Sequence, residues 1–516
     1  MNPSADLLLQ NARVITLDPA KPRAEAIAIK DTRVLDVGSQ KDLEPLKGAV
    51  TKVLDCQGKA VLPGFNDAHC HPIALAASLL SVDCSPSYVR SIGELQDKIR
   101  HRASLTPPGH WIRAVAYNEF YLAEKRHPNR RDLDEAAPDH PVRLTHRSGH
   151  ACVLNSPALN LLGIAYDTPE PPGALIERDL ETGEPNGLLF EMNSYIEGRM
   201  PPLSEEDIQR GIMLANEQFL SHGITSLQDA TWTDTPRRWQ LLRRFQEQGG
   251  LSPHVSLMIG EGEIEEFAER GLTTGSDLGS RLSLGAVKIV LHSATGSLNP
   301  SQEELNRLAH KAHRAGFQLA IHAIEENEVE AAVAALEYAL SRDPRPDHRH
   351  RVEHCSVCPP HLQERLRNAQ AMVVTQPSFL YYSGERYLAT VPAKDLDWLY
   401  PISSLMRKGI KVAAASDAPV VPVNPLRGIY AAVTRTAETG QTLLPQEGVS
   451  KLKALEMHTK EPAYASFEEG VKGCIAPNML ADLIVLNRDP TEIETEDMGN
   501  VEIATTIVDG KVVWQK

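Results

Sequence analysis

Apolar and polar residues alternate at both ends of the chain. Segments 6–18, 24–38 and 51–58 carry β-branched alternation broken by turn signals, which predicts short strands. Segments 481–489 and 504–514 show the same pattern, the second as a hairpin with Asp509-Gly510 at its turn. Neither terminal piece has enough apolar surface to stand alone. We therefore expect residues 1–60 and 474–516 to form one composite β-sandwich.

Between the two ends the pattern changes to strand followed by helix, repeatedly. Residues 204–223 fit an amphipathic helix that begins at Ser204, with Asp207 three residues later, and ends at Gly223. We count eight strand segments in this region: 61–71, 224–230, 254–260, 282–291, 317–323, 351–355, 371–377 and 411–417. This alternation predicts an α/β protein with a (β/α)8 TIM barrel, formed by residues 61–82 and 201–473.

One long stretch does not fit the strand–helix rhythm. Residues 83–200 are rich in proline and arginine and come directly after the first predicted barrel strand. We expect them to form an inserted domain that covers the mouth of the active site.

Length, charge and cysteine content restrict the function. The 516 residues exceed the roughly 250 of a plain TIM barrel. A formal charge of −15 argues against nucleic acid and anionic membranes as partners. No apolar run approaches the roughly 18 residues of a membrane span, and the first residues are not typical of a signal peptide. Seven scattered cysteines fit a reducing cytoplasm. We expect a cytoplasmic protein that acts on a small molecule, and a homo-oligomer stays open.

Polar side chains follow several predicted barrel strands. His69 and His71 are two apart, so on a strand both point to one face. Four further strands add one candidate each: Lys288, His322, His354 and Asp417. Taken singly, each residue also fits a satisfied side chain of the core or rim. Six such residues at strand ends of one barrel favour a common site, since those ends line the active-site mouth of TIM barrels.

The residue types indicate what this site holds. Imidazole nitrogens with carboxylate oxygens suit Zn²⁺ or another first-row divalent ion. Lys288 is the exception, because an unpaired buried lysine is costly. Its ammonium must reach solvent, be paired with a carboxylate such as Glu325 or Glu326, or be covalently altered.

The order HxH, Lys, His, His, Asp on successive strands resembles the amidohydrolase superfamily, in the subtype with two metals bridged by a carboxylated lysine. Longer motifs resemble its amidohydrolase-family-3 branch, which includes N-substituted formamide deformylases. They are PGFNDAHCH, SGHACVLNSPAL, GALIERDLETGEPNGLLFE, QLAIHAIEEN, HRVEHC, VVTQPSF, ASDAPVVPVNPLRGI and LADLIVLNRDP. The resemblance covers nearly the whole chain, because these motifs occur in order along it.

This resemblance implies a role for each candidate. His69 and His71 would bind the more buried of two divalent ions, expected to be Zn²⁺, and His322 and His354 the other. Lys288, as a carbamate, would bridge them. Asp417 would be both a ligand and the general base.

The chain departs from its relatives near the expected substrate mouth. His292-Ser293 stands where relatives often have Asp-Gly, and Glu325-Glu326 replaces the usual Gly-Asp after the third histidine. A substrate known for one relative therefore does not transfer directly.

Four residues are candidates for substrate contacts. His150 in the insertion and His292 after the fourth strand could reach the substrate. Phe379 and Trp398, with the neighbouring tyrosines, follow the seventh strand and could wall an apolar pocket. Each of the four also fits a purely structural role.

The constellation predicts a metal-dependent hydrolase. A metal pair lowers the pKa of bound water to about 7, and the resulting hydroxide would attack a carbonyl. We expect cleavage of a non-peptide C–N bond in a small amide, formamide, carbamate or cyclic amide. The alternatives are an ester or lactone hydrolase with the same metal centre, and a catalytically silent scaffold of the same fold.

Overall fold

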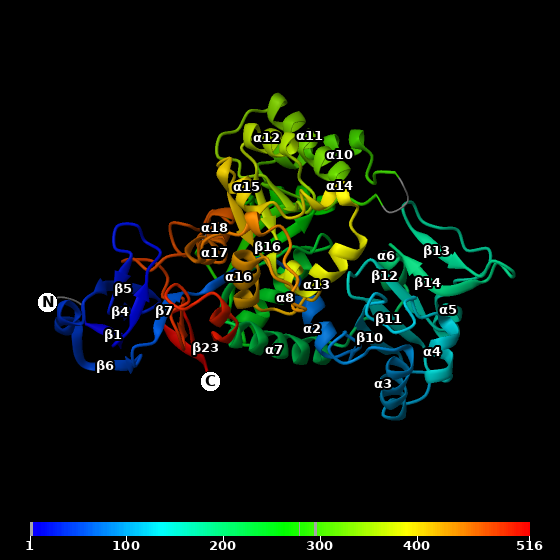
Figure 1. The fold of residues 1–516 in the computed structure, drawn as a ribbon, viewed down its shortest axis with the longest axis horizontal. Coiled ribbons are helices and arrows are strands. Elements are labelled where there is room, and N and C mark those ends of the chain that lie inside the picture. Colours follow the sequence, from blue (N-terminus) through cyan, green and yellow to red (C-terminus); the bar gives the residue numbers. More distant parts are fainter. Residues whose placement is uncertain (1–3, 278, 294–296) are drawn as a thin grey trace.

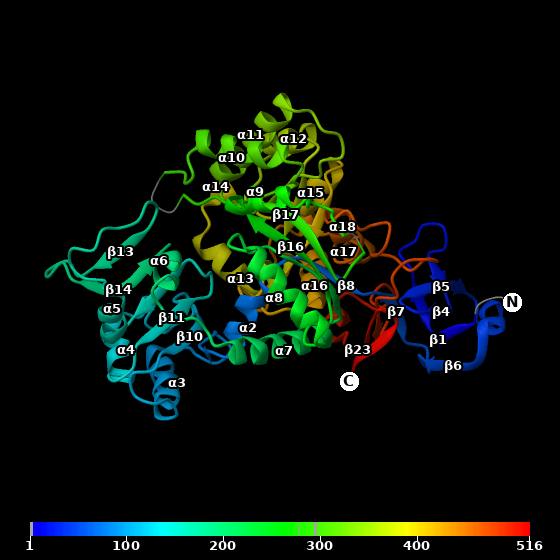
Figure 2. The ribbon, with the colours of Figure 1, turned by 180° about the vertical axis from the view of Figure 1, so that it is seen from behind.

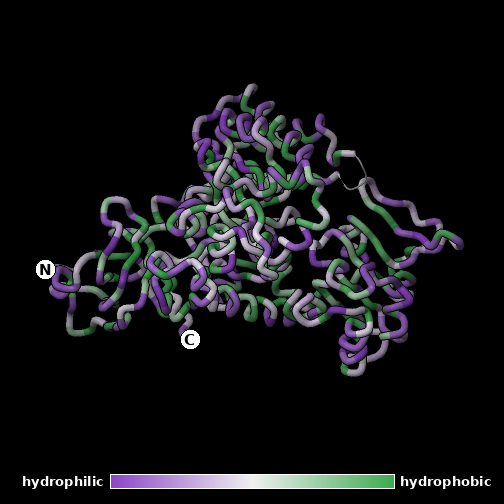
Figure 3. The backbone as a smooth tube through the Cα atoms, viewed as in Figure 1, coloured by the Kyte–Doolittle hydropathy of each residue, from purple (hydrophilic) through white to green (hydrophobic). Residues whose placement is uncertain are grey.

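The computed structural model describes residues 4–277, 279–293 and 297–516. Figure 1 shows three bodies in a row, with a barrel in the centre, a sandwich of sheets from both chain ends on one side, and the region around residues 83–200 on the other. The reverse view in Figure 2 shows the same order. Along the backbone, apolar segments alternate with polar ones, which is typical of elements that bury one face (Figure 3).

The central body is the predicted TIM barrel. Its eight parallel strands follow one another around the sheet in chain order. They are β8 (Phe65–Cys70), β15 (Ile224–Asp229), β16 (His254–Gly260), β17 (Leu282–Val290), β18 (Leu319–Ala323), β19 (Arg351–His354), β20 (Met372–Thr375) and β21 (Val412–Ala414). Just beyond β21, the backbone N–H of Asp417 donates to His69 O at 2.8 Å. The N–H of His71 donates to Ala418 O at 2.9 Å, so the first and last strands meet and nearly close the barrel.

Helices cover the outside of the barrel and bury apolar faces against it. The main ones are α7 (Glu205–Ser221), α8 (Pro236–Glu247), α10 (Gln302–Arg314), α11 (Glu326–Arg342), α12 (Pro360–Asn368), α13 (Pro377–Thr390), α15 (Ile402–Arg407) and α16 (Pro425–Thr434). The cap predicted for α7 is present, since Ser204 Oγ accepts from Asp207 N at 3.0 Å. No helix in the described ranges combines the length and the apolar character that crossing a membrane requires.

Both ends of the chain contribute to the sandwich. One sheet has the order β5 (Arg33–Gly38), β4 (Ala26–Lys30), β1 (Ala5–Gln10), β6 (Lys47–Asp55). The other has the order β24 (Lys511–Gln515), β23 (Ile503–Val508), β22 (Leu483–Leu486), β7 (Ala60–Pro63), β2 (Arg13–Ile15), β3 (Arg23–Ala24). The hairpin expected at Asp509-Gly510 is confirmed: both residues have positive φ, 51° and 70°, as a type I′ turn requires.

The strand expected over residues 61–71 is divided in two. β7 pairs with β2 and β22 in the terminal sheet, whereas β8 belongs to the barrel. Gly64 lies between them, and a Cβ at this position would come within 2.1 Å of Thr225 Oγ1. Only glycine leaves room for the chain to pass this close to β15 as it moves from one sheet to the next.

A third sheet follows the first barrel strand. Its order is β13 (Leu175–Arg178), β14 (Pro185–Phe190), β12 (Ala151–Leu154), β11 (Val142–His146), β10 (Ile112–Tyr117), β9 (Val82–Asp83). Helices α3 (Ile92–Ser104), α4 (Arg130–Ala136), α5 (Ser156–Leu162) and α6 (Asn193–Glu197) accompany it. Leu95, Ile99 and Leu133 are fully buried in its own hydrophobic core. We call residues 83–200 the insertion.

Candidate metal centre and active site

A cavity of about 1480 Å³ lies at the carboxyl ends of the barrel strands. The insertion, α2 (Pro72–Leu79) and α13 contribute to its walls. The six predicted strand-end residues all line it: His69, His71, Lys288, His322, His354 and Asp417. The structure therefore brings together residues that are up to 348 positions apart in the chain.

Asp417 connects the two histidines of the HxH motif. Its Oδ1 lies 3.1 Å from His71 Nε2 and 3.5 Å from His69 Nε2. These three side chains can each place one ligand atom within 4.8 Å of the other two. Burial favours the neutral acid, but the hydrogen bond from His71 and the nearby His69 and His354 hold the pKa of Asp417 below its usual range. The carboxylate is therefore ionised and can accept a proton.

The remaining histidines complete a compact group. The ring of His354 lies 4.9 Å from that of His69 and 4.3 Å from that of His322, measured between centroids. Burial, with further contributions from neighbouring basic groups, lowers the pKa of His69 and of His322 well below 6.5. These imidazoles are neutral at physiological pH, which is the form that binds a metal. His354 and Asp417 have φ of 66° and 58°, in the left-handed region that histidine and aspartate adopt more readily than most non-glycine residues.

Lys288 lies among these histidines. Its Nζ is 3.3 Å from His69 Nε2, and burial lowers its pKa to about 8. Within the described ranges no carboxylate oxygen lies within 4.0 Å of this ammonium. Glu325 instead caps α11, and Glu326 lies 3.9 Å from His361. The ion pair considered for Lys288 from the sequence is therefore not formed with either glutamate.

A second layer of side chains orients the histidines. His69 Nδ1 donates to Glu353 Oε2 at 2.5 Å and His354 Nδ1 donates to Gln376 Oε1 at 2.8 Å, while His71 Nδ1 lies at hydrogen-bond distance, 3.0 Å, from Thr231 Oγ1. Because Nδ1 is the donor in His69 and His354, Nε2 of these two rings keeps a lone pair, whereas Nε2 of His71 faces Asp417. Carboxylate and carbonyl partners of this kind are typical of metal-ligating histidines.

Sequence reasoning missed this second layer. Glu353 is fully buried and paired with Arg351, whose Nη2 also donates to Ala68 O at 2.6 Å. The signal was present in RVEHC, where Arg351 and Glu353 share one face of a core strand. Two charged residues on such a face are tolerated only when paired, so they could have been assigned to a supporting network.

Comparison with known proteins identifies the family. A sequence profile described as "Amidohydrolase family" matches residues 52–514, most of the chain. The chain belongs to the amidohydrolase family.

Individual relatives agree with this assignment. The N-substituted formamide deformylase of Arthrobacter pascens is 30% identical, over all of this chain and 99% of its own. Among solved structures, an uncharacterized metal-dependent hydrolase from Pyrococcus horikoshii OT3 is 23% identical, with a TM-score of 0.75, and 95% of this chain and 99% of that one are covered. A similar hydrolase from Pyrococcus furiosus is 25% identical with a TM-score of 0.73, covering 94% of this chain and 100% of the other. The similarity therefore spans the whole amidohydrolase.

The insertion of this amidohydrolase reaches the strand-end cluster through His150. The ring of His150 lies 6.1 Å from that of His322, and its Nδ1 donates to Glu191 Oε1 at 2.8 Å. This hydrogen bond raises the pKa of His150. His150 lines the cavity, as its prediction as a substrate contact requires.

His292 also lines the cavity and contacts the insertion. Its Nε2 lies 3.1 Å from Asn299 Nδ2, and a Cβ at Gly173 would come within 2.6 Å of its ring. His292 is thus held between its own loop and the insertion.

The predicted aromatic wall is only partly where it was expected. Phe379 and Trp398 do not line the cavity and instead pack in a hydrophobic cluster with Leu399 and Tyr400. Tyr381 and Tyr382, the neighbouring tyrosines considered with them, do line the cavity. The reason is helical geometry: α13 turns Phe379 toward the core and presents the following turn to the cavity.

Proposed function

We propose that this amidohydrolase uses two divalent metal ions, expected to be Zn²⁺, to cleave a C–N bond other than a peptide bond in a small amide, formamide, carbamate or cyclic amide. The observation that carries the proposal is the grouping of four histidines, one aspartate and a buried lysine around one cavity, with Nδ1 of three histidines held by second-layer partners.

The side chains fit such a metal pair. Nitrogen and carboxylate oxygen donors suit Zn²⁺. His69 and His71 would hold one ion, and His322 and His354 the other. Lys288, once carboxylated, would offer an oxygen to each, and Asp417 would complete the set.

The proposed reaction gives a role to Asp417. When bound, the metal pair acidifies coordinated water and polarises the scissile carbonyl. Asp417 then accepts the proton of the attacking water and passes it to the leaving nitrogen. His150 contacts the substrate from the insertion, and His292 borders the same space.

Formamides are the first substrates to test. The relative from Arthrobacter pascens is an N-substituted formamide deformylase by name, and it matches over the full length. Of the replaced residues, His292 lines the cavity, whereas Glu325 and Glu326 do not, so His292 is the one placed to affect which substituent on nitrogen is accepted.

An activity screen of the zinc-loaded protein tests the proposal. We expect close to two ions per chain by elemental analysis, and turnover of at least one of a panel of formamides, carbamates and N-acyl amines. His71→Ala should lose metal and activity, whereas His101→Ala, at an exposed position of α3, should lose neither. Turnover of esters and lactones alone would replace the proposal with an ester hydrolase. Two bound ions without any turnover would favour a silent scaffold.

A further inference from the structure

One region of the cavity wall carries positive charge that the proposed chemistry does not use. Arg147 and Arg90 line the cavity together with Tyr121. In the described ranges, neither arginine has a carboxylate oxygen within 4.0 Å. Arg90 stacks over the ring of Tyr121, with its guanidinium carbon 5.5 Å from the ring centroid. The cations are thus held in place by neutral groups.

A third arginine adds to this charge from α13. The guanidinium carbon of Arg386 lies 4.9 Å from the centroid of the Tyr387 ring, and its Nε is buried without a hydrogen-bond partner among the residues that the structure describes. The Arg147 guanidinium also contacts α13, where Nη1 donates to Ser383 Oγ at 2.8 Å. The insertion and α13 therefore bring two arginines together.

The pKa of the Tyr121 phenol is shifted by all three arginines, which therefore lie near it. Burial raises its pKa and Glu385 adds to that effect, while the charges of Arg147, Arg386 and Arg90 all act to lower it. Glu385 also lines the cavity, but it forms no ion pair within 4.0 Å with any of these three arginines. Arg90 is exposed, whereas Arg147 and Arg386 are partly buried. A partly buried guanidinium without a counter-ion is costly, and an anion from outside would reduce that cost.

This region is within reach of the strand-end cluster. Arg147 and His150 belong to the same short connection between β11 and β12. Three residues of extended chain span at most about 11 Å between Cα atoms. Because the ring of His150 lies 6.1 Å from that of His322, a substrate of one aromatic ring could extend from the metal centre to Arg147.

We propose that Arg147, supported by Arg90 and Arg386, binds an anionic group of the substrate, so that the enzyme prefers small amides that carry a carboxylate on the side of the molecule away from the scissile bond. A guanidinium matches a carboxylate with two parallel hydrogen bonds, which gives both affinity and orientation. This inference rests on the proposed amide hydrolysis.

A matched pair of formamides tests it: the N-formyl derivatives of 4-(aminomethyl)benzoate and of 4-methylbenzylamine. We expect kcat/KM of the zinc-loaded enzyme to be about 10-fold or more higher for the carboxylate, as for hydrogen bonds to charged groups. In Arg147→Met this ratio should fall toward 1, and Arg147→Lys should retain part of it. Arg131→Met, at an exposed position of α4, should leave the ratio as in the wild type.

Other results would overturn the inference. A wild-type ratio near 1 contradicts it directly and needs no variant. If Arg147→Met lowered kcat/KM for both compounds equally, Arg147 would only join the insertion to Ser383. If neither compound were hydrolysed, the proposal of formamide cleavage would be wrong. The ratio of the dissociation constants of the two compounds, measured by calorimetry on wild type and variants, would then still decide whether Arg147 selects the anion.

Discussion

Among single residues, Asp417 has the most direct proposed effect on the chemistry. Its carboxylate is 3.1 Å from His71 Nε2 and is ionised. Asp417→Asn keeps the shape and much of the metal ligation but removes the proton acceptor. We expect turnover to fall about 10²-fold or more while KM changes much less. Steady-state kinetics with a substrate from the screen measures both. Asp97→Asn, at an exposed position on α3, is the control, and wild-type turnover in Asp417→Asn would exclude the proposed base.

A second test at a single residue asks whether Lys288 is carboxylated. An ammonium beside two metal ions would be repelled, whereas a carbamate supplies two oxygens and removes the conflict. We expect Lys288→Ala to lose metal and activity, and short carboxylic acids to restore part of both by filling the gap. Metal content and turnover are measured with added acetate or propionate, and with ethylamine as the control. Rescue by the amine instead of the acids would mean that Lys288 acts as a cation.

Single residues could be placed from the sequence where the two-residue repeat of a strand fixes which face a side chain is on. His69 and His71 could be placed on one face because a strand repeats every two residues. Glu353 and Arg351 follow the same rule but were missed, because their partners come from β8 and β15, distant in sequence. Phe379 was placed in the cavity because the start of α13 relative to the barrel is not visible in the sequence.

Elements were predicted well where both faces of a strand are buried. All residues of β16 are buried, and a mostly apolar, fully buried run between helices is typical of a parallel barrel strand. The segment over residues 61–71 could not be divided from its pattern. β7 and β8 are both fully buried, so hydropathy alone does not show that they belong to different sheets.

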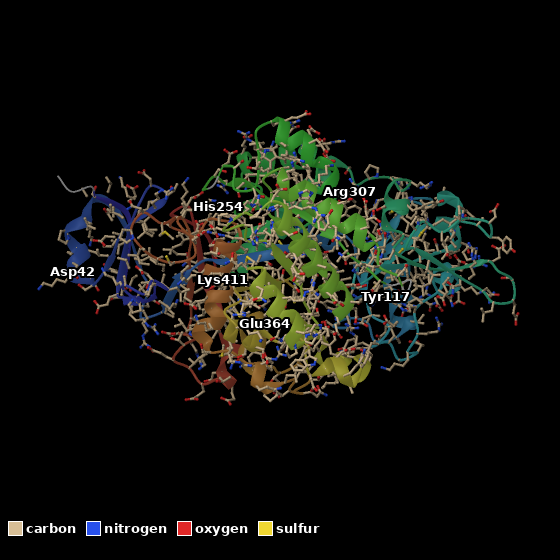
Figure 4. The ribbon with its side chains drawn as sticks, turned by 90° about the horizontal axis from the view of Figure 1, so that it is seen from above. Asp42, Tyr117, His254, Arg307, Glu364 and Lys411 are labelled. Carbon is tan, nitrogen blue, oxygen red and sulfur yellow. The ribbon has the colours of Figure 1, made fainter. Side chains whose placement is uncertain are left out.

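The first residue of β16 makes a contact that should respond to pH. His254 Nε2 lies 3.2 Å from Asp509 Oδ1 and 3.4 Å from Asp482 Oδ2, and Figure 4 shows His254 on the side of the barrel near the sandwich. Nδ1 of the same ring donates to Ser280 O at 3.3 Å. Burial lowers the pKa of His254, but the two carboxylates outweigh it and the net shift is upward. Arg281 lies 3.6 Å from Asp509, and Lys472 also faces this group.

A raised folded-state pKa stabilises the protein below the unfolded pKa of about 6.5, and this contribution disappears as the pH rises through the folded value. The thermal unfolding midpoint of the wild type should exceed that of His254→Gln at low pH. We therefore expect this difference to shrink as the pH is raised above about 6.5. His361→Gln, an exposed histidine on α12, serves as the control. A constant difference between wild type and His254→Gln at all these pH values would mean that His254 is neutral in the folded protein.

At the scale of the whole molecule, the terminal sheet joins the barrel to the rest of the sandwich. Successive residues of β22 face opposite sides: Leu483 and Val485 belong to the core of the sandwich, whereas Ile484 and Leu486 pack with Phe65 against the barrel. The sequence showed that both ends form strands, but not that β22 pairs with β7. That pairing joins residues more than 400 positions apart, and no local pattern specifies it.

This arrangement predicts the effect of removing the tail from Cys474 onward. The deletion takes away β22, β23 and β24, and leaves β7 as an unpaired edge. It also uncovers Val61 and Ile27 on one face and Phe65 and Phe219 on the other, all of which are fully buried. Exposed apolar edges of this kind associate, so we expect the truncated protein to be insoluble when expressed.

Two point variants separate loss of the interface from loss of chain length. Ile484→Asp places a charge in the fully buried contact with the barrel and should reduce soluble yield in the same way, whereas Val512→Asp, at a position 45% exposed, should not. The soluble fraction after centrifugation and the thermal midpoint measure these effects, and a soluble truncated protein that still binds metal would show that the barrel does not depend on the tail.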